Sequence, residues 1–309
     1  MPETEKTFDP QLLRMRLVAT LGAENVLTNE PMSAHTTFGC GGPADLYVIP
    51  HTADEVRACV ERCRESGAPY FLLGCGSDLL VSDAGYRGVI IAIADGLRGM
   101  SADGTRLTFA AGVTLKDATA KACELGLTGF EFACGIPGSI GGACFMNAGA
   151  YDGQMADVLE SVEVIMPDGE YATIPASELA LGYRTSRVRT DGLVVLSATV
   201  ALAPGDPVQI QAKMDDLNAR RAEKQPLEYG SAGSTFKRPT GYFVGKLVTD
   251  AGLKGYRVGN AAVSTKHGGF VVNLGGATAA DVHAVIEHVQ AEVKRLYGVD
   301  LEPEVRFLG

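Results

Sequence analysis

Residues 131–152 read EFACGIPGSIGGACFMNAGAYD, and we expect the rest of the chain to be organised around them. Glycine adopts positive φ without strain and lets another molecule approach the backbone closely. Inward-pointing N–H groups of such a run bind anionic oxygens, above all where a helix begins, as we predict at Ser139 and Ile140. The passage therefore predicts a phosphate or pyrophosphate site, although tight turns in a packed core explain its glycines equally well. The glycines concerned are Gly135, Gly138, Gly141, Gly142 and Gly149.

Length and composition limit the class of protein. A chain of 309 residues with 46% apolar residues allows one large domain or two of ordinary size. The net charge of −10 argues against nucleic acid or a membrane surface as a default partner. Glycine makes up 38 of 309 residues, against a usual fraction of ~7%, and the excess is clustered. We therefore expect ligand-binding loops, and no obligate protein partner is evident.

The seven cysteines indicate a reducing compartment. None forms a CxxC pair, and Cys59 and Cys63 have no nearby histidine to complete a zinc site. The sequence MPETEKTFDP has no hydrophobic signal core, and no apolar run approaches ~18 residues. We therefore expect free thiols, no metal site and a cytoplasmic location.

The order of the predicted elements begins with a helix over 8–30 and a βαβ unit over 45–73, whose helix is capped by Thr52. Pro167-Asp168-Gly169 predicts a hairpin turn. We also predict strands at 88–93, 107–111, 158–166, 170–174, 192–203 and 305–308, and helices at 114–125, 208–224 and 277–297.

A second glycine loop, Gly74-Cys75-Gly76-Ser77-Asp78, follows the βαβ unit. It is no dinucleotide fingerprint, because Leu79 stands where GxGxxG needs glycine and a strand follows instead of a helix. We interpret it as an anion loop between strands. Together with the loop at 135–142 it would cradle the two linked phosphates of a dinucleotide.

The segment 230–266 is basic in an acidic protein. Its only acidic residue is Asp250, so its net charge is +5, which suggests an anionic ligand, although a solvated face is the alternative. The six basic residues are Lys237, Arg238, Lys246, Lys254, Arg257 and Lys266.

The motifs GCGSDLLV, GIPGSIGGACFMNAGAYDG, YRTS, GSAGSTFKRP and LEPEVRFLG follow one another along the chain. In this order they resemble the UDP-N-acetylenolpyruvoylglucosamine reductase family, within the FAD superfamily that includes vanillyl-alcohol oxidase. The resemblance runs from about His35 to the end, and YRTS, GSTFK and PEVR are its most specific parts. The short passage from Arg187 to Ser234 and the sequence FKRP resemble the family's second subtype, with Arg238 where the other subtype has Asn.

The resemblance implies a flavoenzyme with non-covalent FAD that takes hydride from NADPH and reduces an enolpyruvyl UDP-sugar in peptidoglycan precursor synthesis. It implies that Arg184 and Glu304 stabilise the enolate-like intermediate and that Ser234 gives a proton to C2. Glu304 can help only if it is protonated or shares a proton, because adjacent carboxylates repel. Without the resemblance, the three residues would be an ordinary ion pair, a loop hydrogen bond and a terminal charge.

The resemblance also implies ligand contacts. We assign Tyr183 to the pocket shared by nicotinamide and substrate, and Lys237, Arg238 and Lys246 to phosphate groups of the ligands; His267 is expected to be a surface or structural histidine. The expected FAD contacts are Gly74, Cys75, Gly76, Ser77, Asp78, Gly135, Ile136, Pro137, Gly138, Ser139, Gly141, Gly142 and Asn147.

The predicted fold class is α+β. We expect an N-terminal helical segment (1–30), a two-subdomain FAD-binding domain of the vanillyl-alcohol oxidase type (31–203) and a substrate-binding domain (204–309) whose last strand returns to the active site. An FAD-dependent oxidase acting on an alcohol or sugar, and a non-catalytic nucleotide-binding module, are the alternative functions.

Overall fold

The computed structural model describes residues 8–309, which form two compact units built from separate segments of the chain. The first unit contains residues 8–28, 45–75 and 88–219, and the second contains 29–44, 76–87 and 220–309. The segment MPETEKT, part of the sequence interpreted as lacking a signal core, lies outside the described residues. The units therefore divide the chain differently from the contiguous domains predicted at 31–203 and 204–309.

The chain enters the first unit through α1 (Pro10–Leu21), and Asp9 caps this helix by accepting hydrogen bonds from the N–H groups of Gln11 and Leu12. The helix predicted over 8–30 is too long. It stops at Gly22, whose φ is 87°, and β1 (Val26–Pro31) follows. Glycine readily takes this conformation and ends the helix there.

A four-stranded sheet comes next, with the order β1-β2-β5-β3. It contains β2 (Pro43–Val48), β3 (Tyr70–Leu73) and β5 (Tyr86–Ala92), and β3 and β5 are parallel. Helix α2 (Ala53–Ser66) begins after Thr52, whose side chain accepts from the Glu55 N–H, as predicted. Its buried residues are Val56, Cys59, Val60 and Cys63, spaced three and four apart, which places them on one face.

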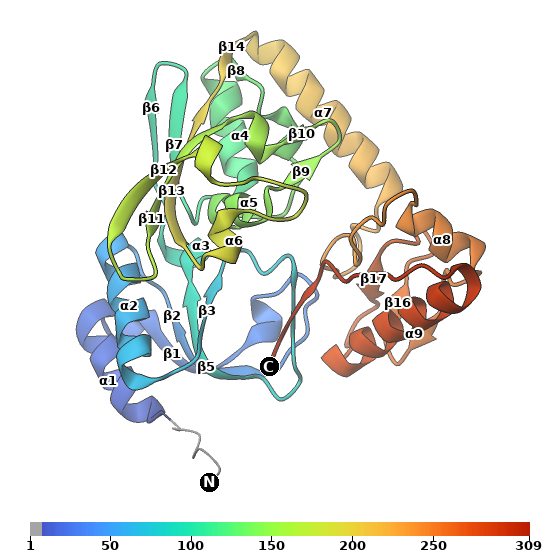
Figure 1. Cartoon of the computed structure of the whole chain (residues 1–309), viewed down its shortest axis with the longest axis horizontal. Helices are drawn as coiled ribbons and strands as arrows, with labels where there is room; N and C mark the ends of the chain where they lie inside the picture. Colours follow the sequence, from blue (N-terminus) through green and yellow to red (C-terminus); the bar gives the residue numbers. More distant parts are fainter. Residues whose placement is uncertain (1–7) are drawn as a thin grey trace. The chain divides into compact units, whose positions relative to one another are not determined.

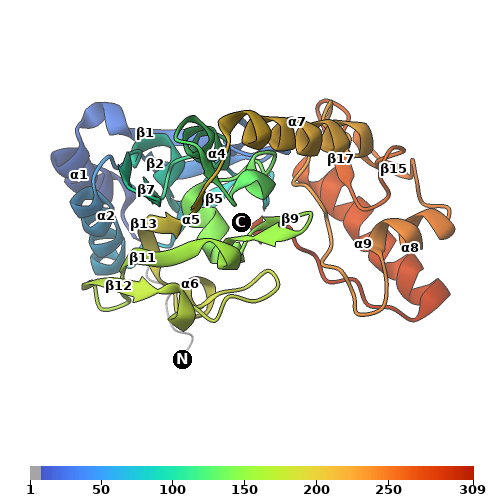
Figure 2. The same ribbon diagram turned by 90° about the horizontal axis from the view of Figure 1, so that it is seen from above.

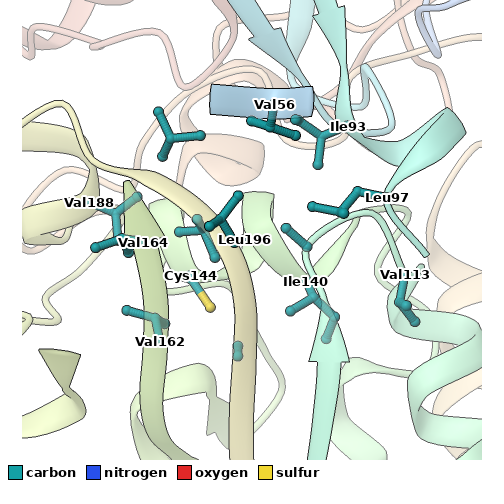
Figure 3. Packing of buried hydrophobic residues seen from close by; sticks show 14 of the residues in the cluster. Val56, Ile93, Leu97, Val113, Ile140, Cys144, Val162, Val164, Val188 and Leu196 are labelled. Carbon is teal, nitrogen blue, oxygen red and sulfur yellow. The ribbon is translucent and has the colours of Figure 1, made fainter. Parts of the chain in front are cut away.

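The larger part of the first unit is an antiparallel sheet in the order β12-β11-β13-β7-β6. Its strands are β6 (Met100–Asp103), β7 (Arg106–Ala110), β11 (Leu159–Ile165), β12 (Tyr171–Pro175) and β13 (Val194–Ala201). The hairpin predicted at 167–169 joins β11 to β12. Helix α5 (Ile140–Met146) packs on this sheet, with Ile140 and Cys144 among the side chains of Val162, Val164 and Leu196 (Figure 3).

The remaining elements of the first unit are short, apart from α4 and α7. They are α3 (Ile93–Gly96), α4 (Leu115–Glu124), α6 (Arg187–Thr190) and α7 (Pro207–Lys224, which continues into the second unit), β8 (Leu127–Thr128), β9 (Gly149–Ala150), β10 (Gly153–Gln154) and β14 (Ala203–Pro204). The 3-10 turns of this unit are η1 (Ala23–Asn25), η3 (Glu131–Ala133), η4 (Met155–Asp157) and η5 (Ala176–Glu178).

In the second unit, α9 (Ala279–Tyr297) packs against a small antiparallel sheet, and α8 (Val244–Asp250) lies beside α9 (Figures 1 and 2). The sheet strands are β15 (Arg257–Val258), β16 (Ala261–Val263) and β17 (Val271–Asn273), and η2 (Met32–Ala34) also belongs here. Separately, β4 (Leu79–Val81) pairs in parallel with the C-terminal β18 (Arg306–Leu308). Asp83 accepts hydrogen bonds from the N–H groups of Ala279 and Ala280, which fixes the start of α9.

Candidate functional site

The two glycine loops meet in the first unit. Gly74 follows β3, and Ser139 caps α5 by accepting from the N–H of Gly142. A Cβ atom on Gly74 would lie only 2.7 Å from the Ser139 hydroxyl oxygen. Any larger residue at 74 would therefore displace the Ser139 hydroxyl that caps α5, so glycine lets the two loops approach without disturbing this cap.

Only N–H groups without a hydrogen bond to the protein are available to a ligand in these two loops. Most of the N–H groups there are already bonded: Ile136 donates to Ala133, Gly138 to Ile136, Ile140 to Val113 and Gly141 to Ala111. Within residues 8–309, the N–H groups of Cys75, Gly135 and Ser139 donate no hydrogen bond to the protein. These three donors suit the anionic oxygens of a pyrophosphate, so this part of the chain fits FAD, with fewer direct donors than the glycine count suggests.

Asn147, one of the expected FAD contacts, has its side-chain amide bonded within the protein. It is buried, has a φ of 44° at the end of α5, and donates from its side-chain amide to Gln154 and to the Gly182 carbonyl, both at 3.1 Å. Its side-chain oxygen accepts from the Ala156 N–H at 2.9 Å. Because these bonds occupy the amide, Asn147 ties α5 to the loop that carries Tyr183 and Arg184.

The YRTS sequence forms a tight turn in the first unit. Gly182 and Thr185 exchange two backbone hydrogen bonds of 3.0 and 3.3 Å, and Arg184 between them has a φ of 56°. The guanidinium carbon of Arg184 lies 5.1 Å from the ring centre of Tyr183, and the Arg184 carbonyl accepts from Arg189. Positive φ is uncommon for a residue with a side chain and marks a position at which function has to be considered.

Ser234 and Glu304 come together in the second unit. The Glu304 N–H donates to the Thr235 carbonyl at 2.9 Å, and the Lys237 N–H donates to the Glu302 carbonyl at 2.9 Å. Residues 234–237 and 302–305 therefore run side by side in opposite directions, with Phe236 opposite Pro303. This register places the half-buried Glu304 opposite Thr235, the residue that directly follows the exposed Ser234.

The predicted phosphate-binding side chains of the second unit have protein partners. Lys237 forms an ion pair with Glu302, and Lys246 donates to Asp250 at 2.7 Å. The guanidinium carbon of Arg238 lies 3.8 Å from the ring centre of Phe243, and its Nε donates to the Tyr242 carbonyl. Acidic partners of Lys237 and Lys246 thus reduce the positive charge that the sequence suggested. The guanidinium of Arg238 is stacked on the ring of Phe243, a contact that the sequence did not predict.

The loop segment 76–78 belongs to the second unit. Gly76 has a φ of 60°, a Cβ atom there would lie 2.0 Å from the His35 carbonyl oxygen, and the Gly76 carbonyl accepts from the Thr37 N–H. The Asp78 carbonyl accepts from the N–H of Arg306, the first residue of β18. Contacts between distant segments hold this half of the loop, and no local sequence signal reveals them.

Residues 8–309 contain no group of three His, Cys, Asp or Glu side chains placed so that it could hold a metal ion. None of the helices in this described range is both long and apolar enough to cross a membrane.

Comparisons with known proteins agree across both units. Residues 44–174 match the FAD binding domain family, and residues 225–308 match the family described as UDP-N-acetylenolpyruvoylglucosamine reductase, C-terminal domain. The enzyme of that name from Clostridium perfringens is 53% identical over 286 residues, which cover 93% of this chain and 94% of that protein. The enzyme from Pediococcus pentosaceus is 50% identical over 284 residues, covering 92% and 94%.

A solved structure gives the same result. The crystal structure of UDP-N-acetylenolpyruvylglucosamine reductase from Thermus caldophilus aligns with a TM-score of 0.78 at 36% identity, over 92% of this chain and 98% of that one. The predicted FAD-binding fold of the vanillyl-alcohol oxidase type, followed by a second α+β domain, is thereby confirmed. The chain therefore belongs to the UDP-N-acetylenolpyruvoylglucosamine reductase family.

Proposed function

We propose that this flavoprotein uses NADPH to reduce the enolpyruvyl group of UDP-N-acetylglucosamine enolpyruvate, giving UDP-N-acetylmuramate for peptidoglycan precursor synthesis. The observation that carries this function is the family membership, which extends over more than nine-tenths of the chain and includes both domains. The glycine cradle, with the N–H donors of Cys75, Gly135 and Ser139, would hold the pyrophosphate of FAD. FAD supplies hydride transfer from NADPH to C3 of the enol ether.

The side chains of this protein would manage the charge and the proton that accompany the hydride. When hydride reaches C3, negative charge develops at C2 and in the attached carboxylate, and Ser234 would complete the reduction by giving its hydroxyl proton to C2. Arg184 offers a fixed fork of donors for the carboxylate and places positive charge where the negative charge accumulates. Glu304, bonded through its backbone to the residue after Ser234, would hold a proton near the developing anion.

Substrate binding would use the second unit's cations. The stacked Arg238 is our first choice for the UDP diphosphate, because Phe243 and the Tyr242 carbonyl fix its orientation and its planar fork matches two phosphate oxygens. Lys246 is more exposed than its partner Asp250 and can turn toward an anion, whereas Lys237 is largely covered and paired. Tyr183, which is 58% exposed, would line the pocket shared by nicotinamide and substrate.

A reducing, cytoplasmic location fits this function. All seven cysteines are free thiols, and six of them are buried. Burial raises the pKa of Cys59 and Cys63 to about 12, so neither forms a thiolate readily at neutral pH. Free thiols of this kind are usual in a reducing compartment, which is where NADPH and UDP-sugars also occur.

The test follows the colour of the bound flavin. NADPH should bleach the purified holoenzyme under anaerobic conditions, and the enolpyruvyl UDP-sugar should then restore the absorbance while UDP-N-acetylmuramate forms. An oxidase acting on an alcohol or sugar would be bleached by that substrate and not by NADPH, and a nucleotide-binding module would be colourless. Either result would overturn the proposed function.

A further inference from the structure

We propose that His267 is a positioning residue for Ser234 and Glu304, and that it acts through a neutral imidazole that accepts a hydrogen bond from the backbone of Gly269. The inference rests on the proposed function, since it concerns the residues that we assign to the second half-reaction.

Three consecutive hydrogen bonds in the second unit connect this imidazole to Thr235, which directly follows the proposed proton donor Ser234, and to Glu304. Nδ1 of His267 accepts from the Gly269 N–H at 3.1 Å, and the Gly269 carbonyl accepts from the Thr235 N–H at 2.9 Å. The Thr235 carbonyl then accepts from the Glu304 N–H at 2.9 Å. Thr235 is buried and directly follows Ser234, so displacement of Gly269 would move the backbone between Ser234 and Glu304.

The hydroxyl of Thr235 strengthens the same connection. It accepts from the Val271 N–H at 2.9 Å, so both the backbone and the side chain of Thr235 are bonded to segment 269–271. The position of segment 269–271 therefore determines where the Ser234 backbone lies. On its N-terminal side, this segment follows directly from the turn that contains His267.

Several contacts fix the imidazole itself. The Ser264 hydroxyl oxygen accepts from the N–H groups of Lys266 and His267, and the His267 carbonyl accepts from the Phe270 N–H at 3.1 Å. The ring lies edge-on to Phe270, with their centres 4.9 Å apart. A Cβ atom on Gly245 would lie 3.4 Å from Cε1, so the start of α8 closes the other side of the ring.

This geometry selects one protonation state. Because Nδ1 accepts a hydrogen bond from a backbone N–H, it carries no proton, and the proton of the neutral ring is on Nε2. Protonation of Nδ1 would put two donors face to face and break the first bond of the chain. We therefore expect the connection to fail when the histidine becomes charged.

The surroundings keep the ring neutral at physiological pH. Burial, and then the charge of Lys254, lower the pKa of His267 from its usual value of 6.5, against the effect of its backbone hydrogen bond. The other charged groups on the neighbouring elements have partners of their own. Lys246 and Asp250 on α8 pair with each other, and Lys266 donates to the Ala222 carbonyl. The bond to Gly269 is thus present at neutral pH and is lost as the pH falls through this lowered pKa.

The test compares two amide variants of His267. In His267→Asn the side-chain oxygen can take the place of Nδ1, whereas in His267→Gln the extra methylene moves the oxygen away and Gly269 loses its acceptor. We expect His267→Gln to slow reoxidation of the reduced flavin by the enolpyruvyl UDP-sugar about ten-fold or more, because small displacements of reacting groups are costly. His267→Asn should retain most of the wild-type rate, and neither should slow reduction by NADPH.

The pH profile separates positioning from a general loss of stability. Between about pH 8 and about pH 5, the wild-type reoxidation rate should fall as the His267 imidazole takes up a proton. His267→Asn has no group that titrates in this range at position 267, so its rate should not show this decline. A merely structural histidine would alter melting temperature without moving the profile. An unchanged acid decline in His267→Asn, or a normal reoxidation rate in His267→Gln, would overturn the proposal.

Controls keep the two proposals distinguishable. His283 is half-exposed on α9 in the same unit and pairs with Glu287, so His283→Gln should change neither half-reaction. If His267→Gln does not fold, His267→Leu can replace it, because leucine also lacks the hydrogen-bond acceptor. The same slowing of reoxidation is expected in this variant. Normal reoxidation in Ser234→Ala would instead mean that the proposed role of Ser234 has failed, whatever the His267 variants do.

Discussion

Arg184 is held in a conformation that a side chain normally avoids. Its φ is 56°, and it lies in the turn that two backbone hydrogen bonds between Gly182 and Thr185 close. The side chain of Arg189 donates to the Arg184 carbonyl. Such a conformation costs on the order of 1–3 kcal/mol and persists only where the surrounding structure enforces it. Here the turn is anchored further by Asn147 and by Ser186, whose hydroxyl donates to the Phe145 carbonyl. We infer that this rigidity presents the guanidinium in one direction.

Ser234 can be tested by separating the two half-reactions. If it donates the proton to C2, it acts only after hydride has left the flavin, so Ser234→Ala should be reduced by NADPH at close to the normal rate. Its reoxidation by substrate should slow by at least ~10²-fold, the lower range for losing a positioned general acid. Ser234→Cys should recover part of the loss, because a thiol also donates. Stopped-flow absorbance measures both steps, and slow reduction by NADPH in Ser234→Ala would contradict this assignment.

Lys246 gives a second prediction at this scale. The side chain of Lys246 is 73% exposed and pairs with Asp250, so solvent would screen its interaction with a ligand phosphate and keep it weak. Lys246→Ala should raise KM for the UDP-sugar or for NADPH about three- to ten-fold while FAD content stays normal. Lys294→Ala is the matched control, because Lys294 forms a comparable exposed pair with Asp300 in the same unit. Equal KM values in both variants would remove Lys246 from the site.

At the scale of elements, the two glycine loops depend on close approach of β3 and α5. Gly74→Ala would place a methyl group 2.7 Å from the Ser139 hydroxyl, so either this hydroxyl leaves its capping position or the loops separate. We expect lower FAD occupancy in the purified variant and a loss of stability of about 1–3 kcal/mol, the usual cost of overpacking. In Gly99→Ala the new atom meets nothing closer than 4.0 Å and FAD occupancy should be unchanged. Full occupancy in Gly74→Ala would show that the cradle tolerates separation.

Glu131 connects η3, β8 and α7 through a buried carboxylate. Burial tends to raise the pKa of Glu131, but hydrogen bonds from Thr128, from its own backbone, from Lys213 and from Gly129 outweigh burial and lower it below 4.5. A lowered pKa in the folded state means that the carboxylate stabilises the protein above about pH 4.5. This contribution is lost as the pH falls through the pKa of the folded state.

The matching prediction is a pH profile of stability. Glu131→Gln should destabilise the protein at pH 7 by about 1–3 kcal/mol, because it weakens hydrogen bonds to a buried acceptor. The difference from wild type should shrink on acidification below pH 4.5, as the wild-type carboxylate takes up its proton. Urea unfolding at several pH values measures both. A difference that stays constant with pH would show that the charge of Glu131 does not contribute.

At the scale of the whole molecule, the sequence revealed local features better than long-range ones. The periodicity of α2, its cap Thr52 and the start of α5 at Ser139 and Ile140 are local features, and they were predicted correctly. Pairing of Leu79 with Arg306, which places β18 beside β4, depends on residues far apart in the chain and leaves no periodic signal. For the same reason, the discontinuous segments of the two units could not be predicted. At the site, motifs suggested Arg184, Ser234 and Glu304 as catalytic candidates, but they gave no sign of the hydrogen bonds through Thr235 and Gly269.

FAD can be held either by non-covalent contacts alone or through a covalent bond to a side chain. A covalent bond to the flavin would need a nucleophilic side chain near the cradle, and Cys75 is the thiol within the glycine loop. Burial is the main cause that raises the pKa of the Cys75 thiol, although Arg98 opposes it, so at neutral pH the protonated and less reactive form prevails. We therefore expect FAD to be held only by non-covalent contacts. Acid precipitation of the holoenzyme should release all the yellow colour into the supernatant, and Cys75→Ser should behave in the same way. Flavin that stays with the wild-type pellet but is released from Cys75→Ser would identify a covalent link at this cysteine and contradict the prediction.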